Sequence, residues 1–350
     1  KNMKMRKIVC SFMISVVCFM TAISGVSATS YDTSKINAAY SKVVEYYKNN
    51  NNLNNADKIL AVESLGLEAE SNQFDTSSAD LSSTSLSKKI VTEVLLGVDP
   101  TEDKKTLESQ IDENGNVEGS WGASSDVWTL YALYVTSSEK TNLIANKLND
   151  ELAASSVCGY EWGGTYYADY DTTGWVIEGL AVVNKEKYAT TINKAIDYIK
   201  NNTTMTTTGW VTADNVDTQS QVLEGMFAYD TNALLNDSYT VHPVDCLLNT
   251  QLSDGSFPSG YNAEYTTAEV AKTLGTYKNG SVIIKAKKAY DKMMNPEQPD
   301  NTKPAQPTDT KKDSQSTNKV ETTNQKTTSV KTGDETNVVI FVSLSMVSGG

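Results

Sequence analysis

Apolar residues recur at helical spacing along most of this chain, and the helical segments themselves recur about every 47 residues. One marker of the repeat is an apolar residue near the end of a helical run, present as Leu133, Leu180, Met226 and Leu274. A second marker is an aspartate in another helical run, present as Asp150, Asp197, Asp245 and Asp291. Because both markers keep register over four units, the pattern indicates internal duplication of a helical unit.

The clearest unit spans residues 244–277 and has the pattern of two helices joined by a turn. Ser253-Asp254-Gly255 has the composition of that turn. Thr266 and Thr267 are expected to cap the second helix. Such helix pairs bury their apolar faces only by stacking on neighbouring pairs. The sequence therefore predicts an all-α fold for residues 30–296.

The order of helix, Asp-Gly-Ser-Phe or Gly-Ser-Trp, and second helix resembles the repeat of terpenoid cyclases and protein prenyltransferases. The residues that carry this resemblance are Gly119-Ser120-Trp121 and Asp254-Gly255-Ser256-Phe257. The pattern is closer still to bacterial surface relatives of the transcobalamin-type toroid. The resemblance implies an α/α toroid of about six helix pairs, each with an inner and an outer helix. Translated units would gather the starts of all inner helices, and the loops before them, at one mouth.

This mouth is where we expect a ligand-binding site, because helix starts there supply unpaired N–H donors. Aromatic faces would give contact area, and carboxylates would orient a polar ligand. The candidate residues are Trp162, Tyr166, Tyr170, Asp171, Trp210, Asp217 and Glu264. The structural alternative is that the acids cap helices and the aromatic side chains fill spaces between them.

Three catalytic classes fit the residues poorly. Asp169-Tyr170-Asp171 is similar to the acidic motif of squalene cyclases but lacks its further acid. The sole histidine, His242, precedes Pro243 at the expected start of an outer helix, which does not suit a cavity zinc site. Cys158 is followed at the third position by Glu161, where complement-type thioester domains need glutamine.

We therefore expect a non-catalytic module that binds a glycan or another small molecule, with no catalytic residue, no metal and no cofactor that the residues identify. The alternative is an envelope enzyme, carbohydrate-active or cyclase-like, that uses carboxylates at the mouth. The formal charge of −13 argues against nucleic acid as a partner. Cys158 and Cys246 could be bridged or could remain as two buried thiols. We expect a monomer.

The two ends of the chain resemble targeting segments. A basic start, an apolar stretch and Val26-Ser27-Ala28 predict a signal peptide over residues 1–28, with a membrane anchor as the alternative. Residues 297–329 are rich in Pro, Thr and Lys and predict an extended linker. Residues 330–350 resemble a sortase-type sorting signal of Gram-positive surface proteins. Ser329-Val330 replace the usual Leu-Pro, and the apolar run is too short for a bilayer, which indicates truncation.

The sorting resemblance implies that cleavage between Thr332 and Gly333 joins the protein to peptidoglycan. The expected location is therefore the extracellular cell wall, with the linker as a stalk.

Overall fold

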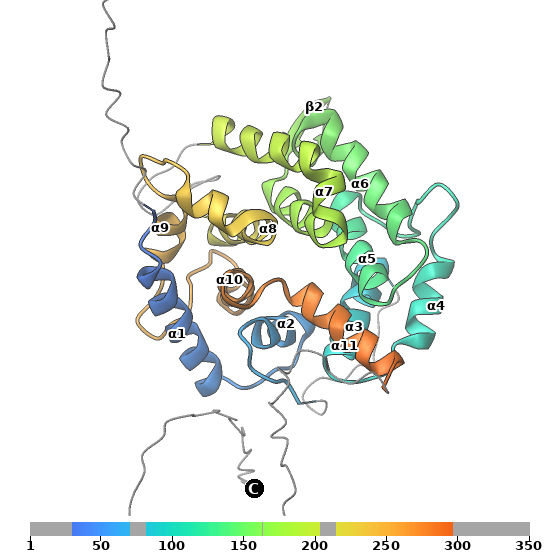
Figure 1. Cartoon of the computed structure of the whole chain (residues 1–350), viewed down its shortest axis with the longest axis horizontal. Coiled ribbons are helices and arrows are strands. Elements are labelled where there is room, and N and C mark those ends of the chain that lie inside the picture. The colour runs from blue at the N-terminus through green and yellow to red at the C-terminus, as the bar shows by residue number, and fades with distance from the viewer. Residues whose placement is uncertain (1–29, 71–81, 163, 204–214, 297–350) are drawn as a thin grey trace, which may run out of the picture.

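A computed structural model describes residues 30–70, 82–162, 164–203 and 215–296. Within these ranges the chain forms eleven helices and one two-stranded sheet (Figure 1). The helices are α1 (Ser34–Asn49), α2 (Ala56–Ser64), α3 (Ser83–Leu95), α4 (Thr101–Ser109), α5 (Ala123–Val135), α6 (Thr141–Ser155), α7 (Tyr170–Asn202), α8 (Val216–Asn236), α9 (Pro243–Leu248), α10 (Ala263–Asn279) and α11 (Val282–Met294). The prediction of a helical fold is confirmed. The signal, linker and sorting segments, including Thr332 and Gly333, lie outside the described residues.

Six helices, which we call the inner helices, contact one another in a closed cycle. They are α2, α3, α5, the first part of α7 (170–183), the first part of α8 (216–229) and α10. Each packs against the next in this order, and α10 packs against α2. Figure 1 shows them around the centre of the molecule, with α1, α4, α6 and α9 at the periphery. The first and last inner helices are therefore neighbours in space.

Two of the inner helices continue into outer helical segments through a sharp kink. Asn184 in α7 and Asp230 in α8 both leave the helical region, with φ near −160° and ψ near 90°. The Asn184 side chain accepts a hydrogen bond from the Lys187 N–H at 2.9 Å, and Asp230 accepts one from the Ala233 N–H at 2.9 Å. Each residue thus caps the segment that follows, which lets the chain turn from the inner to the outer layer without a loop.

The inner helices of the second half of the chain begin at Asn or Asp caps. Asn215 accepts hydrogen bonds from the first turn of α8, and Asn262 does the same for α10. The expectation that Thr266 and Thr267 cap α10 is wrong, because both residues lie inside the helix. Thr266 donates to the carbonyl of Asn262 at 3.1 Å, and Thr267 accepts from the N–H of Phe257 at 3.0 Å. The amide side chain of Asn262 thus takes the capping role, for which threonine is the weaker residue.

The apolar repeat marker lies on four consecutive inner helices, as predicted. Leu133, Leu180, Met226 and Leu274 are all buried, on α5, α7, α8 and α10. Glycines bring some of these helices into backbone contact. A Cβ atom on Gly225 would overlap the carbonyl oxygen of Gly174, and one on Gly275 would overlap that of Ser64. The approach of α7 to α8, and of α10 to α2, therefore depends on the missing side chains.

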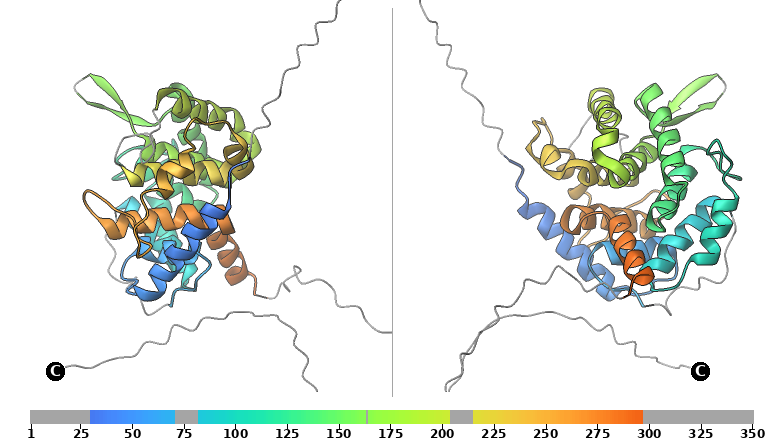
Figure 2. Two further views of the ribbon diagram at one scale, coloured as in Figure 1. Left: turned by 90° about the vertical axis from the view of Figure 1, so that its left-hand side faces the viewer. Right: turned by 45° about the vertical axis from the view of Figure 1, so that its right-hand side comes forward.

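A short hairpin interrupts the helical pattern between α6 and α7, in a stretch that the sequence indicates as an aromatic loop. Strands β1 (Gly159–Trp162) and β2 (Thr165–Ala168) pair antiparallel, and the hairpin projects from the body of the molecule (Figure 2). The alternation of aromatic and polar residues favours strands. Gly164, with φ of 79°, supplies the backbone conformation that a tight turn needs.

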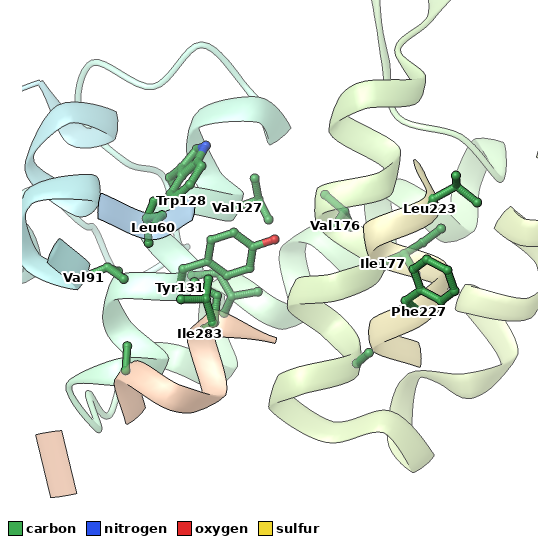
Figure 3. Packing of buried hydrophobic residues seen from close by; sticks show 14 of the residues in the cluster. Leu60, Val91, Val127, Trp128, Tyr131, Val176, Ile177, Leu223, Phe227 and Ile283 are labelled. Carbon is green, nitrogen blue, oxygen red and sulfur yellow. The ribbon is translucent and has the colours of Figure 1, made fainter. Parts of the chain in front are cut away.

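The last helix, α11, lies across the inner helices and contacts α2, α3, α5 and α10. Ile283 from α11 packs beside Leu60, Val91 and Tyr131, from three different inner helices (Figure 3). Lys285 forms an ion pair with the buried Glu63 at 2.6 Å. This helix therefore packs against four of the six inner helices.

Cys158 and Cys246 are both buried and are not joined in a disulfide, which decides between the two alternatives that the sequence left open. In the described part of the chain, no helix has the length and apolar character needed to cross a membrane.

Candidate functional site

The predicted mouth residues fall into three groups in the structure. Tyr170, Asp171 and Asp217 lie in the first turns of α7 and α8, with Tyr170 and Asp171 half-buried and Asp217 buried. Trp162 and Tyr166 lie on β1 and β2, and their side chains are outside the described structure, as is all of Trp210. Glu264 is an exposed residue that forms an ion pair with Lys58 at 2.8 Å.

Glu264 lies apart from Asp171 and Asp217 because the inward positions of α10 are shifted by one residue relative to those of α7 and α8. Asp171, Asp217 and Glu264 are each the second residue after a helix cap. The inward positions deeper in α10 lie one residue farther from the cap than in α7 or α8. One residue rotates a side chain by about 100° around a helix. In α10, Tyr265 therefore corresponds to Asp171 and Asp217.

Helical spacing continues this inward face through three levels on each of α7, α8 and α10. Residues at i, i+4 and i+7 share one face of a helix. We call the nine side chains at these positions the acidic arc: Asp171, Trp175 and Glu178 on α7, Asp217, Gln221 and Glu224 on α8, and Tyr265, Glu269 and Lys272 on α10. Their mutual contacts, given below, show that they face a common interior.

The upper level of the acidic arc contains the two predicted carboxylates. Burial raises the pKa of Asp171 from 3.8 to about 6, against a lowering hydrogen bond with Thr218. The charges of Asp169, Asp217 and Glu269 add to the rise, because like charges disfavour ionisation. Burial and a hydrogen bond to Asp217 raise the pKa of the Tyr261 hydroxyl as well. The two acids thus share one electrostatic environment.

Gln221 connects α8 to α10 in the middle level. Its amide nitrogen donates to Oε2 of Glu269 at 3.1 Å and contacts the Tyr265 hydroxyl at 3.4 Å. Gln221 and Glu269 are buried, whereas Trp175 and Tyr265 are half-buried. The two aromatic side chains therefore form the accessible edge of the arc, above buried polar groups.

The deep level holds a buried ion cluster. The Lys272 ammonium lies 3.0 Å from Oε2 of Glu269 and 3.7 Å from Oε2 of Glu224. Burial alone would lower the pKa of Lys272, but Glu224 and Glu269 raise it further than burial lowers it. Burial raises the pKa of Glu224, with Lys272 acting in the opposite direction. The single lysine thus holds its charge beside Glu269 and beside Glu224, whose carboxyl group burial favours in the neutral form.

Glu178 belongs to the same level but has a complete set of partners. Tyr131 donates to its Oε2 at 2.9 Å, and Ser281, the cap of α11, donates to its Oε1 at 2.6 Å. The pKa of Glu178 is raised by burial, which these two hydrogen bonds and Lys272 oppose. This residue therefore joins the acidic arc to α11 and to α5.

The other three inner helices present apolar residues at the corresponding level. Leu60, Val91 and Tyr131 each lie four residues before the last residue of their helix, on α2, α3 and α5. Together with Trp128, one turn earlier on α5, we call them the apolar arc. Figure 3 shows these four side chains together, with the Tyr131 hydroxyl pointing towards α7. The ammonium groups of Lys88 and Lys272 lie 4.5 and 5.4 Å from the centre of the Trp128 ring.

Sequence reasoning missed the deep level, although the repeat marked it. Tyr131, Glu178, Glu224 and Lys272 are spaced 47, 46 and 48 residues apart, each two residues before an apolar marker. The same spacing of 47, 46 and 48 residues relates the residues one helical turn earlier, namely Trp128, Trp175, Gln221 and Glu269. The register of the apolar residues could have identified these positions. An ordinary amphipathic helix, however, places charged residues towards solvent.

Other candidate chemistry is absent from this interior. His242 caps α9, where its Nδ1 accepts from the Val244 N–H at 3.2 Å, and its ring packs against Tyr31 and Tyr239. Within the described ranges, no group of three or more His, Cys, Asp or Glu side chains is arranged to hold a metal ion. Burial raises the pKa of the Cys158 thiol, which disfavours the reactive thiolate.

The acidic arc can therefore accept hydrogen bonds and bind positive charge, and Asp171 could also exchange a proton near neutral pH.

A comparison with protein-family models, curated proteins and solved structures finds no match to this chain.

Proposed function

We propose that residues 30–296 form an α/α toroid that serves as the ligand-binding module of a secreted, cell-wall-anchored protein. The closed cycle of six inner helices supports the toroid, because it pairs the first unit with the last. The outer segments that follow α5, α7 and α8 support it further, because they repeat the same inner-to-outer step.

The observation that carries the binding function is the half-buried rim of the acidic arc above buried, polar side chains. Asp171 and Asp217 start neighbouring helices, and Trp175 and Tyr265 lie beside them at the accessible edge. A merely structural interior would gain stability from apolar residues at these positions, since burying polar groups costs free energy. The ligand that suits the rim is a glycan or another small polar molecule, held by aromatic faces and oriented by carboxylates.

A binding screen on the full chain against glycans and small polar molecules tests this function. Asp171→Asn and Trp175→Leu should each weaken binding by about tenfold or more, the loss expected when a charged hydrogen bond or an aromatic contact is removed. Asp197→Asn, an exposed aspartate on the outer part of α7, is the matched control and should bind normally. Normal binding by both rim variants, with an intact fold, would refute a site at this mouth.

A second candidate is a hydrolytic envelope enzyme, and one observation favours it. The Asp171 carboxyl, with a pKa of about 6, lies close enough to Asp217 to respond to its charge. A carboxyl group with a raised pKa beside a second carboxyl group is the arrangement of a general acid and its partner base. Turnover of any bound glycan, lost in both Asp171→Asn and Asp217→Asn, would support this candidate over simple binding.

The envelope location is supported by the signal-like start, the linker and the resemblance to a sorting signal. Mass spectrometry of cell-wall digests should find a mature C-terminus at Thr332 linked to wall peptide. Recovery of mature protein that still carries residues 338–347 would contradict anchoring at this threonine.

A further inference from the structure

The hydrogen bonds of the acidic arc leave several acceptors unused at its centre, against one unused donor, the indole N–H of Trp175. Oε2 of Glu269 accepts a hydrogen bond from the Gln221 amide and forms an ion pair with the Lys272 ammonium, whereas Oε1 of the same carboxylate has no hydrogen-bond partner. The carbonyl oxygen of the Gln221 side chain and Oε2 of Glu224 also lack hydrogen-bond donors. All three residues are at most 1% exposed. Unpaired buried acceptors are costly, so the interior is better suited to a state in which donors are supplied.

The charges of the arc are unbalanced in the same direction. Its inward side chains include five carboxyl groups, namely Asp171, Asp217, Glu178, Glu224 and Glu269, against the single ammonium of Lys272. A buried carboxylate is stable only when a cation or several donors compensate it. A cation that enters the arc would therefore be attracted, and it would find acceptors without partners.

The aromatic side chains favour an organic cation. The Trp128 ring already has two lysine ammonium groups near its face. Trp175 packs edge-on against Trp128, with ring centroids 5.9 Å apart, and is itself half-buried at the accessible edge. Indole faces attract ammonium groups, and they also cover the carbon skeleton that carries the charge. The described carboxylates, in contrast, are not arranged as a set of metal ligands.

We propose that the ligand of this site carries a primary ammonium group, which donates to Gln221 Oε1 and Glu269 Oε1 while its carbon skeleton lies against Trp175. The proposal rests on the proposed binding function and adds the chemical class of the ligand. A primary ammonium has three N–H donors, enough for both orphaned acceptors and a third contact. Amino sugars and diamines with a free amine belong to this class, and their fully N-acetylated forms do not.

Matched pairs of probes test the class on the unmodified full chain. Isothermal titration calorimetry would compare glucosamine with N-acetylglucosamine, and cadaverine with N,N′-diacetylcadaverine. Each free amine should bind at least about tenfold more tightly than its acetylated partner, because acetylation removes the charge and two donors. Added salt should weaken the amines more than the amides. Equal or tighter binding of the acetylated members would overturn the proposal, as would failure of every amine to bind.

Two isosteric variants then test the position. Glu269→Gln removes the charge beside the orphaned acceptors and should weaken amine binding by about tenfold or more. Glu63→Gln is the matched control, because Glu63 is a buried glutamate outside the acidic arc and has a partner on each carboxylate oxygen. Its effect on amine binding should stay within about twofold. Equal losses in the two variants would reject the assigned contacts.

The outcomes separate the inference from the function on which it rests. Tight binding of neutral glycans that depends on Asp171 and Trp175, with no preference for amines, would retain the binding function and reject the ammonium. Loss of amine binding in Glu269→Gln with an unchanged melting temperature would support both.

Discussion

The apolar arc and the acidic arc occupy corresponding turns of the inner helices but bury opposite kinds of side chain. Leu60 and Val91 fill their level with aliphatic groups, whereas Glu178, Glu224 and Lys272 occupy that level on the other side. Both arcs lie on inner helices that pack against one another in one closed cycle. The difference shows that helices with the same kind of packing can carry different inward chemistry.

The largest expected effect comes from removing the only cation of the acidic arc. Lys272→Met leaves Glu224 and Glu269 buried without their partner and should reduce the free energy of unfolding by about 3–5 kcal/mol at pH 7. The loss should shrink at lower pH, because burial raises the pKa of Glu224 and protonation then neutralises this carboxylate. Chemical denaturation at several pH values measures it. A small, pH-independent loss would show that the cluster is already neutral.

The matching change in the apolar arc should lack this pH dependence. Leu60→Ala removes a fully buried side chain between α2 and its neighbours, at a cost of about 2–5 kcal/mol. Because no charge is involved, the cost should be the same at pH 5 and pH 8. A clear pH dependence would mean that the two arcs are coupled through Tyr131 and Glu178.

A substitution in the upper level of the acidic arc should stabilise the fold, whereas the two preceding substitutions destabilise it. Asp171 has a folded pKa of about 6 against an ordinary 3.8, so its contribution is fully present below pH 4 and is lost as pH rises through 6. Asp171→Asn should therefore stabilise the fold at pH 7 by about 1–3 kcal/mol and flatten the stability profile between pH 4 and 6. Thermal unfolding across this range provides the measurement. Destabilisation at pH 7 would mean that the carboxylate has a compensating partner.

The smallest expected difference concerns how the helices of the two arcs begin. Asn215 caps α8 with hydrogen bonds to two backbone N–H groups, whereas Gly122 caps α5 without a side chain. Asn215→Ala should cost about 1 kcal/mol. Gly122→Asn is the companion variant and should bring no gain, because Gly122 has φ of 96°, which strains other residues. Hydrogen exchange at the first turns of α5 and α8 would compare the two.

The repeat in the sequence was sufficient to predict the helices and their apolar markers, because a fixed period transmits directly into helix placement. It was insufficient for the site in two respects. Glu264 matched Asp217 by position after the cap, but one extra residue in α10 rotated it towards Lys58. Glu178 and Lys272 had the appearance of ordinary polar positions, because periodicity alone cannot show that both faces of an inner helix are covered. The hairpin was also missed, since its strands are only four residues long.

The placement of α11 has a mechanical consequence. The chain continues from α11 into residues 297–350, so a force applied along that continuation reaches α11 first. Three kinds of interaction hold that helix to the interior. Ser281 donates a hydrogen bond to Glu178, Lys285 forms an ion pair with Glu63, and Ile283 packs beside the apolar arc. Tension would therefore be borne by this hydrogen bond, this ion pair and the buried side chains of α11, namely Val282, Ile283, Ala286 and Tyr290. Detachment of α11 would free an oxygen of Glu178, so a pull on the tail would alter the interior before any inner helix unfolds.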